Sequence, residues 1–400
     1  MKAEMRLMMP FRGELVLPEP LRGSDVGTFT EQTMWERIPA IARRVVAENE
    51  FAPDIKARLL ALADEIPQGT IRPFFPPATP SAIPPDFDNW QAYAAPYIGE
   101  TWLTVPWFFA ETYFFRRVLE ATDYFANGAD PYAYQKRRGL ETALASWHKR
   151  PFPTTLPDLL LLDLWGNQMD MSLWPVDEAV RPGHENEAQL AHLLVDDRTA
   201  VCHHLQSQPP GHIILVNDNV GAELLADLLL ADWLLREETA VSLTFHLKPN
   251  PTYVSDATIA DVETTIARLR QEPHLPLQQL GERLQRWLAV GQLRLAIHSF
   301  WVSPLPWWQM PPELAHELAQ ARLVISKGDA NYRRLLGDRR WPYTTPFADV
   351  VGYFPAPLLA LRTLKSEQML GLSAARLADL QANHPGWLVN GEWGVVQWRE

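Results

Sequence analysis

Cysteine is almost absent from this chain, because Cys202 is the only one among 400 residues. No intrachain disulfide can form, which suits a reducing compartment. Two histidines, His203 and His204, follow it, so a thiol–histidine catalytic pair is one interpretation of this stretch. The usual role of a free cysteine is instead that of a small buried hydrophobic residue. The adjacent histidines face different sides of a helix and cannot chelate one metal ion together.

Long apolar runs without charge are also missing. The stretch 101–115 contains Glu111, and the stretch 159–165 contains Asp163. Both are shorter than the ~20 residues that a membrane-spanning helix requires. We interpret them as core, including the aromatic residues that follow Trp107. The N-terminus carries no continuous apolar region typical of a signal peptide. We therefore expect a cytoplasmic protein with no membrane partner.

Positive charge is in deficit, with Lys+Arg 36 against Asp+Glu 48 and a formal net charge of -12. Such a body repels nucleic acid, so we expect no nucleic-acid partner. A phosphorylated substrate would need a local positive site built from a few basic side chains and a metal ion. The hydrophobic content of 47% excludes global disorder. The sequence leaves the oligomeric state open.

Several catalytic signatures are missing as well. The first β-branched run is not followed by a Gly-x-Gly-x-x-Gly turn or a Walker-type lysine, so a nucleotide fingerprint is absent. There is no Gly-x-Ser-x-Gly elbow and no recognisable Ser/His/Asp order. Carboxylates, amides and lysines are left to carry any chemistry.

Hydrophobic periodicity divides the chain into two parts. Residues 1–206 predict a mainly helical N-terminal domain with a proline-rich crossing at 67–85. In residues 207–400, strands alternate with helices, which predicts an α/β domain whose parallel sheet is covered on both faces. The predicted strands are 211–217, 240–246, 293–298, 321–326 and 358–364.

Polar side chains follow these strands, and ligands of open parallel sheets bind beyond the carboxyl ends of the strands. In chain order the candidates are Asp218, Asn219, Lys248, Ser255, Asp256, His298, Lys327, Gly328, Asp329, Ala330, Asn331 and Lys365. Oxygen donors at Asp218 and Asn219 suit a hard divalent cation. The helix start beside them and the Lys327–Asn331 turn suit phosphate oxygens. This is the chemistry of a metal–phosphate site.

The same residues have simpler interpretations, which the sequence leaves open. Asp218 and Asn219 suit a plain turn whose side chain caps the following helix. Ser255 or Asp256 suits the same capping role. The turn that begins at Lys327 suits a solvated connection, and Lys365 suits an ordinary surface lysine.

Taken together, several segments resemble the damage-control phosphatase family. The motifs are Val216–Leu224, Phe245–Lys248 with Val254–Thr258, Lys327–Arg333 and Arg362–Lys365. The Arg-Thr-x-Lys ending is similar to that of the subgroup that includes the acidic-residue methyltransferase homologues. Upstream, the segments Leu21–Asp25 with Arg37–Pro39, Glu111–Arg117 and Leu164–Leu173 also look like this subgroup. The resemblance covers the chain from about residue 20 to about residue 370.

The resemblance implies a three-layer α/β/α sandwich with an all-helical N-terminal domain. It implies a divalent metal ion (Mn, Co, Ni or Mg) held by Asp218, Asn219 and Asp256. It implies substrate contacts from Asp218, Asn219, the Lys327–Asn331 loop and Lys365, and sugar phosphates such as fructose 1-phosphate or fructose 6-phosphate as substrates. One departure, Asn250-Pro251-Thr252-Tyr253 before Asp256, bears on substrate preference.

On this basis we expect hydrolysis of a phosphomonoester, with Asp218, Asn219, Asp256, Lys327 and Lys365 as the catalytic set. Asp218 as a covalent nucleophile is an alternative, although Val220 stands where related aspartate phosphatases carry a second aspartate.

Two rival functions remain open from the sequence. One is an S-adenosylmethionine-dependent protein carboxyl methyltransferase, in which Glu223 would meet the ribose. The other is a non-catalytic sugar-phosphate-binding protein. We also expect the helical domain to close over the sheet edge. Glu111, Arg116 and Asn167 are its candidate polar residues, with Asn167 facing the substrate pocket. The alternative for Asn167 is a purely structural turn at Trp165-Gly166-Asn167.

Overall fold

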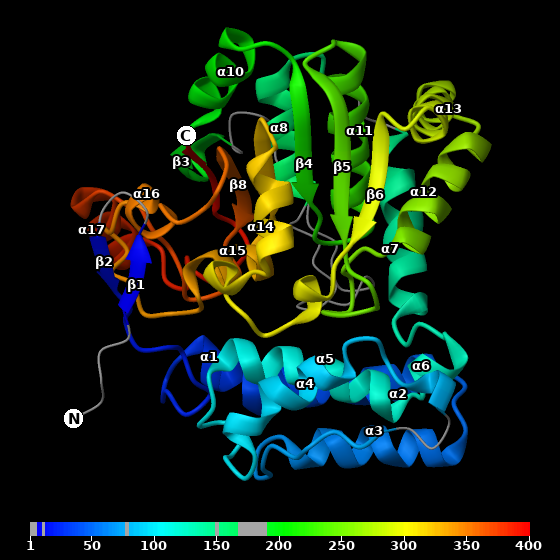
Figure 1. Cartoon of the computed structure of the whole chain (residues 1–400), viewed down its shortest axis with the longest axis vertical. Coiled ribbons are helices and arrows are strands. Elements are labelled where there is room, and N and C mark those ends of the chain that lie inside the picture. The colour runs from blue at the N-terminus through cyan, green and yellow to red at the C-terminus, as the bar shows by residue number, and fades with distance from the viewer. Residues whose placement is uncertain (1–5, 10–12, 77–79, 149–151, 167–189) are drawn as a thin grey trace.

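The computed structural model describes residues 6–9, 13–76, 80–148, 152–166 and 190–400. Within these residues, an α/β sandwich stands on a layer of helices (Figure 1). The strands of the large sheet are β3 (Leu193–Asp196), β4 (Gly211–Val216), β5 (Ala240–Leu247), β6 (Leu293–Ile297), β7 (Leu323–Lys327), β8 (Leu358–Thr363) and β9 (Gly394–Arg399). A two-stranded hairpin, β1 (Arg6–Met9) and β2 (Gly13–Val16), precedes them.

The strand order is β3-β9-β8-β7-β4-β5-β6. The neighbours β8, β7, β4, β5 and β6 pair in parallel, whereas β9 runs antiparallel to β8. From β4 the chain continues to β5 and β6 on one side and then returns to β7 on the other. The carboxyl ends of β4 and β7 therefore flank the point at which the strand order reverses, where such sheets bind their ligands.

The central strands are apolar on both faces, as expected for a sheet covered by helices on both sides. In β4, Ile213 and Leu215 pack into one core, and Ile214 and Val216 pack into the other. This alternation follows from the two-residue period of a strand. The two cores make the sandwich a three-layer structure, which confirms the predicted fold class.

Helices cover the two faces of the sheet. The helices after the cap are α7 (Ala133–Trp147), α8 (Leu156–Gly166), α10 (Arg198–Ser207), α11 (Ala222–Arg236), α12 (Ile259–Gln271), α13 (Leu275–Ala289), η5 (Ser299–Val302), η6 (Trp307–Gln309), α14 (Pro312–Ala319), α15 (Gly328–Leu336), α16 (Phe347–Val350) and α17 (Ala374–Asn383). Residues of α8, α11, α12 and α13 share one core, and residues of α14, α15 and α16 share the other.

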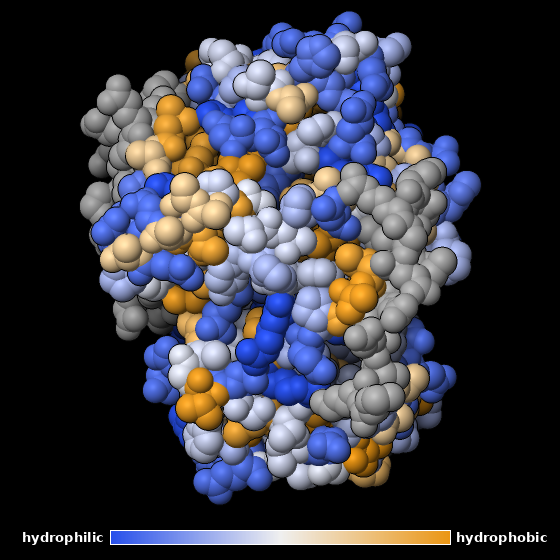
Figure 2. Space-filling view, turned by 90° about the vertical axis from the view of Figure 1, so that its left-hand side faces the viewer, coloured by the Kyte–Doolittle hydropathy of each residue, from blue (hydrophilic) through white to orange (hydrophobic). Residues whose placement is uncertain are grey.

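The helical layer, here called the cap, lies at the end of the sheet toward which β4 and β5 point (Figure 1). Its helices are α1 (Phe29–Gln32), η1 (Thr33–Arg37), α2 (Ile38–Glu48), α3 (Pro53–Glu65), η2 (Pro80–Ala82), α4 (Phe87–Ala94), η3 (Ala95–Tyr97), α5 (Trp107–Ala121) and α6 (Tyr124–Asn127). On the face shown in Figure 2, hydrophilic side chains gather along the junction between cap and sandwich, where the surface is hollowed.

Some elements differ from the sequence prediction. The hairpin β1–β2 and the antiparallel strand β9 were not anticipated, because short strands carry little periodicity. Within residues 1–206, which were predicted to form a mainly helical domain, β3 precedes α10 and pairs with β9. The sandwich therefore begins earlier than the predicted boundary at 206/207. In the described part of the chain, no helix is both long and apolar enough to cross a membrane.

Candidate functional site

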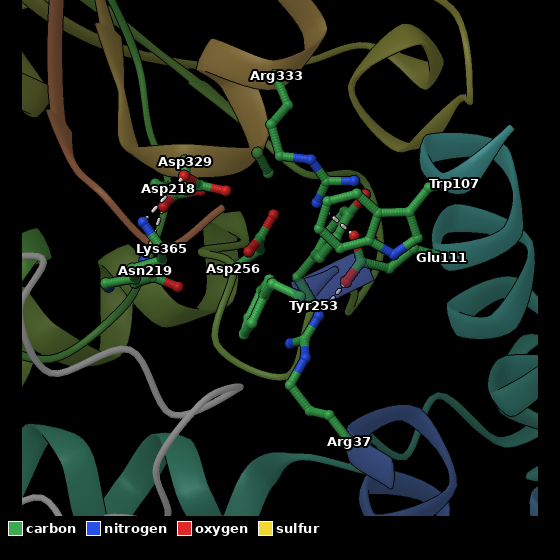
Figure 3. Close-up of a pocket in the computed structure, with 12 residues that line it drawn as sticks. Arg37, Trp107, Glu111, Asp218, Asn219, Tyr253, Asp256, Asp329, Arg333 and Lys365 are labelled. Carbon is green, nitrogen blue, oxygen red and sulfur yellow. Dashed lines mark hydrogen bonds and ion pairs between the residues drawn. The ribbon is translucent and has the colours of Figure 1, made fainter. Parts of the chain in front are cut away.

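A recess lies beyond the carboxyl ends of β4 and β7, where cap and sandwich meet (Figure 3). It contains about 400 Å³ of space not filled by protein atoms, a figure that includes its open mouth. The residues that line it are Phe29, Arg37, Trp107, Glu111, Asp218, Asn219, Tyr253, Asp256, Asp329, Ala330, Arg333 and Lys365.

Asp218 and Asn219 enter the recess directly after β4. Both are nearly buried, with exposed fractions of 4% and 5%. The N-cap of α11 is Gly221, and no side chain caps that helix. The simpler interpretation of this pair as helix caps is therefore wrong. The Asn219 amide nitrogen donates to Asp218 Oδ2 over 2.7 Å.

Asp256 reaches the same place from the loop after β5. The backbone N–H of Ala257 donates to the carbonyl of Asp218 over 2.8 Å, and that of Val220 donates to the carbonyl of Ser255 over 2.8 Å. The two loops are thus held side by side, as an isolated bridge between Asn219 and Asp256. Thr258 caps α12, so Ser255 and Asp256 do not have the capping role that the sequence left open.

The loop that presents Asp256 has an unusual backbone. Tyr253 and Val254 have φ values of 47° and 69°, in the left-handed region. This region is costly for a β-branched residue such as Val254. Strain of this kind persists only where the surroundings enforce it, and it is common at functional sites. The departure from the family pattern at Asn250–Tyr253 coincides with this conformation.

Basic residues approach the carboxylates from two sides. Lys248 Nζ lies 3.2 Å from Asp256 Oδ2, and both residues are almost fully buried. Lys365 lines the recess beside Asp218 and Asn219 (Figure 3). The structure therefore does not support the simpler interpretation of Lys365 as a surface lysine, since only 2% of it is exposed.

Asp329 is held in a fixed orientation at the start of α15. Its Oδ1 accepts hydrogen bonds from Arg362 Nε over 2.8 Å and from Ser366 Oγ over 3.0 Å. Gly328 precedes it with a φ of 80°, and the Asp218 carboxylate occupies the place of a Cβ there. A larger residue at position 328 would displace that carboxylate, so glycine is required by space as well as by conformation.

The cap contributes one wall of the recess through Arg37, Trp107 and Glu111. Glu111 accepts from Arg37 Nη2 and, over 2.6 Å, from Arg333 Nη1. The Arg333 guanidinium also stacks on Trp107, with its carbon 3.6 Å from the ring centroid. Arg333 is further paired with Asp338 over 2.8 Å. Trp107 is thus both core, as predicted, and part of the wall.

Lys327 does not line the recess, and its predicted contact with phosphate is wrong. The residue is fully buried, and its Nζ lies 2.7 Å from Asp163 Oδ1, 2.9 Å from Asp227 Oδ1 and 3.3 Å from Glu223 Oε1. These carboxylates raise the pKa of Lys327 well above its ordinary value against the lowering effect of burial. Three buried acids need a counter-charge, and the lysine that ends β7 provides it.

The remaining predicted residues are divided between the recess and its support. Ala330 lines the recess, whereas Asn331 is buried and donates to the carbonyl of Lys327 over 2.9 Å. Glu223 is buried behind Asn219. Arg116 pairs with Asp86 inside the cap at 2.9 Å and does not reach the recess lining. The prediction for Asn167 lies outside the described residues.

Sequence reasoning assigned no role to Phe29, Arg37, Tyr253 and Arg333, which also line the recess. Arg37 and Arg333 lie within motifs that carried the family resemblance, so the sequence did contain a signal that could have indicated them as site residues. The candidate thiol lies elsewhere: Cys202 is on α10 and half-buried, and burial raises the pKa of its thiol. A thiol with a raised pKa is a poor nucleophile.

The charges around the recess favour a bound cation. The lining contains four carboxylates, at Glu111, Asp218, Asp256 and Asp329, against three basic residues, at Arg37, Arg333 and Lys365. With Lys248 beside Asp256, these charges nearly balance, so a bound divalent cation would add the positive charge that a dianionic phosphate needs.

The donor chemistry fits that ion. Among the described residues, no three His, Cys, Asp or Glu side chains form a metal cluster. The predicted set consists of two carboxylates and one amide oxygen, which suits a hard divalent cation. Asn219 Oδ1 accepts from Ser255 Oγ, and a carbonyl oxygen has a second lone pair.

Comparisons with known proteins show which family this chain is similar to. The family model of the damage-control phosphatase ARMT1-like domain matches residues 33–380. The chain is 28% identical over 445 residues to the damage-control phosphatase ARMT1 of Homo sapiens, with 96% of this chain and 99% of the relative covered. It is 30% identical over 431 residues to that of Xenopus tropicalis, with 93% and 96% covered.

A solved structure gives the same fold. A DUF89 family protein from Pyrococcus horikoshii superposes with a TM-score of 0.50 at 14% identity, over 92% of this chain and 98% of that one. Because the family model spans most of the sequence, the chain belongs to the damage-control phosphatase ARMT1-like family.

Proposed function

We propose that this protein is a metal-dependent phosphatase that hydrolyses phosphomonoesters of small metabolites. The observation that carries the proposal is the convergence of Asp218, Asn219 and Asp256 at the reversal point of the sheet, beside Lys365 and Asp329. Family membership supports the same reaction. We infer that Asp218, Asn219 and Asp256 hold a divalent metal ion (Mn²⁺, Co²⁺, Ni²⁺ or Mg²⁺).

A bound divalent cation would supply Lewis acidity toward a phosphoryl oxygen. The chain's own residues do the rest. Lys365 is placed to neutralise an equatorial phosphoryl oxygen, a preorganised electrostatic role. Asp329, with one oxygen fixed by Arg362 and Ser366, is placed to accept a hydrogen bond from a substrate hydroxyl. The cap residues Arg37 and Glu111 form one wall of the recess.

The substrates we propose are sugar phosphates such as fructose 1-phosphate and fructose 6-phosphate. A small recess lined by both carboxylates and cations suits a molecule with several hydroxyls and one phosphate. We place Asp218 as a ligand rather than a nucleophile. The methyltransferase alternative is less well supported, because Glu223 is buried behind Asn219 with an exposed fraction of 1%.

The test is phosphate release from a panel of sugar phosphates by metal-free enzyme, with and without added Mn²⁺, Co²⁺, Ni²⁺ or Mg²⁺. We expect no release in excess chelator and recovery on addition of metal. The variant Asp256→Asn should lose both metal binding and release. Full activity of a protein shown to contain no metal would refute the proposal. Binding of sugar phosphate without release under every metal would favour the non-catalytic alternative.

A further inference from the structure

Each residue that flanks Asp218 is tied to a carboxylate of helix α11. The Asn219 amide nitrogen donates to Glu223 Oε2 over 2.9 Å, and the Asn217 amide nitrogen donates to Asp227 Oδ2 over 2.8 Å. Glu223 and Asp227 are four residues apart and therefore lie on the same face of the helix. Both are buried, with exposed fractions of 1% and 0%. The turn after β4 is thus fixed at both ends by one helix.

The two carboxylates are stabilised from behind by Lys327. Its Nζ contacts both of them and also Asp163 of α8. A buried carboxylate without a partner would be costly. Lys327, which ends β7, therefore allows α11 to present acidic side chains to the turn. Lys327 therefore supports the turn after β4 through Glu223 and Asp227, and it does not enter the recess itself.

The orientation of the Asn219 amide is the chemical consequence. An amide presents either its oxygen or its nitrogen in a given direction, and its neighbours decide which. Asp218 and Glu223 accept from the nitrogen of Asn219, while Ser255 Oγ donates to the oxygen. The oxygen is consequently directed toward the loop that carries Asp256, the side on which a cation would need it.

We propose that Glu223, held by Lys327, is a positioning residue that orients the amide of Asn219 for cation binding. This inference rests on the metal site of the proposed function. Residues behind metal ligands typically change metal affinity 10- to 100-fold when mutated. Glu223 itself lies outside the recess lining.

Two variants of Glu223 separate charge from position. Glu223→Gln removes the charge and can turn either an oxygen or a nitrogen toward Asn219. Glu223→Asp keeps the charge but is one methylene shorter and loses the contact. We expect Glu223→Asp to weaken Mn²⁺ binding, measured by calorimetry on metal-free protein, by roughly 10- to 100-fold, and Glu223→Gln to weaken it less, because the Gln oxygen can still accept from the amide of Asn219. Turnover at saturating Mn²⁺ should recover toward the wild-type value, because excess metal compensates for weaker binding.

The matched control is Asp232→Asn on the same helix. Asp232 is equally buried, accepts from Arg283 Nη2 over 2.8 Å and from Trp287 Nε1 over 3.0 Å, and lies outside the recess lining. The Asp232→Asn variant should lose thermal stability, while its Mn²⁺ affinity stays within about threefold of wild type. Equal affinity in wild type and Glu223→Asp would overturn the positioning role. Absence of Mn²⁺ binding by the folded wild type would instead refute the metal site itself.

Discussion

Glu111 of α5 and Arg333 of α15 form a buried ion pair, with Oε2 2.6 Å from Nη1, which joins the cap to the sandwich at the wall of the recess. Glu111 also accepts from Arg37 of η1, so one carboxylate connects three elements. The contact holds the cap over the carboxyl ends of β4 and β7. It explains how residues far apart in the sequence enclose a single recess.

The first prediction concerns this connection. Glu111→Ala removes one carboxylate partner from the buried Arg333, which keeps Asp338, and one from Arg37. Removal of one member of a buried pair costs about 3–5 kcal/mol. We expect a loss of that order in the free energy of unfolding measured with urea. The control is Glu120→Ala on the same helix, where the pair with Arg117 is partly exposed and worth at most about 1 kcal/mol. Similar losses in both variants would contradict the prediction.

The second prediction concerns Lys365. Lys365→Met keeps most of the apolar stem but removes the charge that we propose neutralises the substrate phosphate. We expect kcat/KM for a sugar phosphate to fall roughly 10²-fold, or about 2.7 kcal/mol, by analogy with a lost oxyanion donor. Metal affinity should be nearly unchanged, since lysine is not a ligand.

Steady-state kinetics and calorimetry with Mn²⁺ check the Lys365 prediction. Lys56→Met on α3, outside the recess lining, is the control and should behave as wild type. Activity of Lys365→Met within about threefold of wild type would place the phosphate elsewhere in the recess.

The sequence predicted the parts of the fold with strong periodicity. The central strands β4, β5, β7 and β8 were located within a few residues, because each is an apolar run followed by a helix. The strands β3 and β9 could not be found in this way. They lie at one side of the sheet, and their pairing joins segments at least 200 residues apart. Such pairing is a property of the tertiary structure and not of a local window.

The sequence could predict those site residues whose position depends only on which strand they follow. Asp218, Asn219, Asp256 and Lys365 each follow a strand and meet at one edge, as the strand rule requires. The same rule failed for Lys327, since it gives the position of a residue along a strand but not the direction of its side chain. Three acidic residues from α8 and α11 decide that direction, and no sequence spacing reveals their approach.

The third prediction follows from the buried position of Lys327. Lys327→Met would leave Asp163, Asp227 and Glu223 without their cation in a region closed to water. We expect the free energy of unfolding to fall by about 3–5 kcal/mol or the protein to fail to fold. The control, Lys136→Met, also breaks a pair of a nearly buried lysine, but its partners Asp130 and Asp261 are 23% and 18% exposed. Water can solvate those carboxylates, so the loss should be smaller.

Urea unfolding of the two lysine variants decides the matter. A smaller loss for Lys327→Met than for Lys136→Met would show that the acidic cluster is neutralised by some other means. A fully stable Lys327→Met that loses only kcat/KM would restore the role in phosphate binding that the sequence suggested.

The fourth prediction concerns a proton shared within the group of buried acids around Lys327, namely Asp163, Glu223 and Asp227. Burial raises the pKa of Asp227 well above its ordinary value, and the neighbouring Asp163 adds to the effect. Asp163 Oδ2 is buried and accepts no hydrogen bond from any described donor, so a proton retained by Asp227 would supply one. We infer that Asp227 is protonated in the folded protein at a pH at which it is ionised in the unfolded chain.

The sign of the resulting pH dependence is fixed by the proton count. Below about pH 3.9 Asp227 binds its proton in both states and contributes no slope. As the pH rises above that value, the unfolded chain releases the proton while the folded protein keeps it. The free energy of unfolding therefore decreases with pH by up to about 1.4 kcal/mol per unit until the folded pKa is passed.

Asp227→Asn mimics the neutral acid and should remove this part of the slope. Urea unfolding over the range between these pKa values measures it, and infrared absorption of a neutral carboxylic acid, lost in the variant, identifies the group. An unchanged slope together with an unchanged infrared band would show that Asp227 is ionised beside Lys327 in the folded protein.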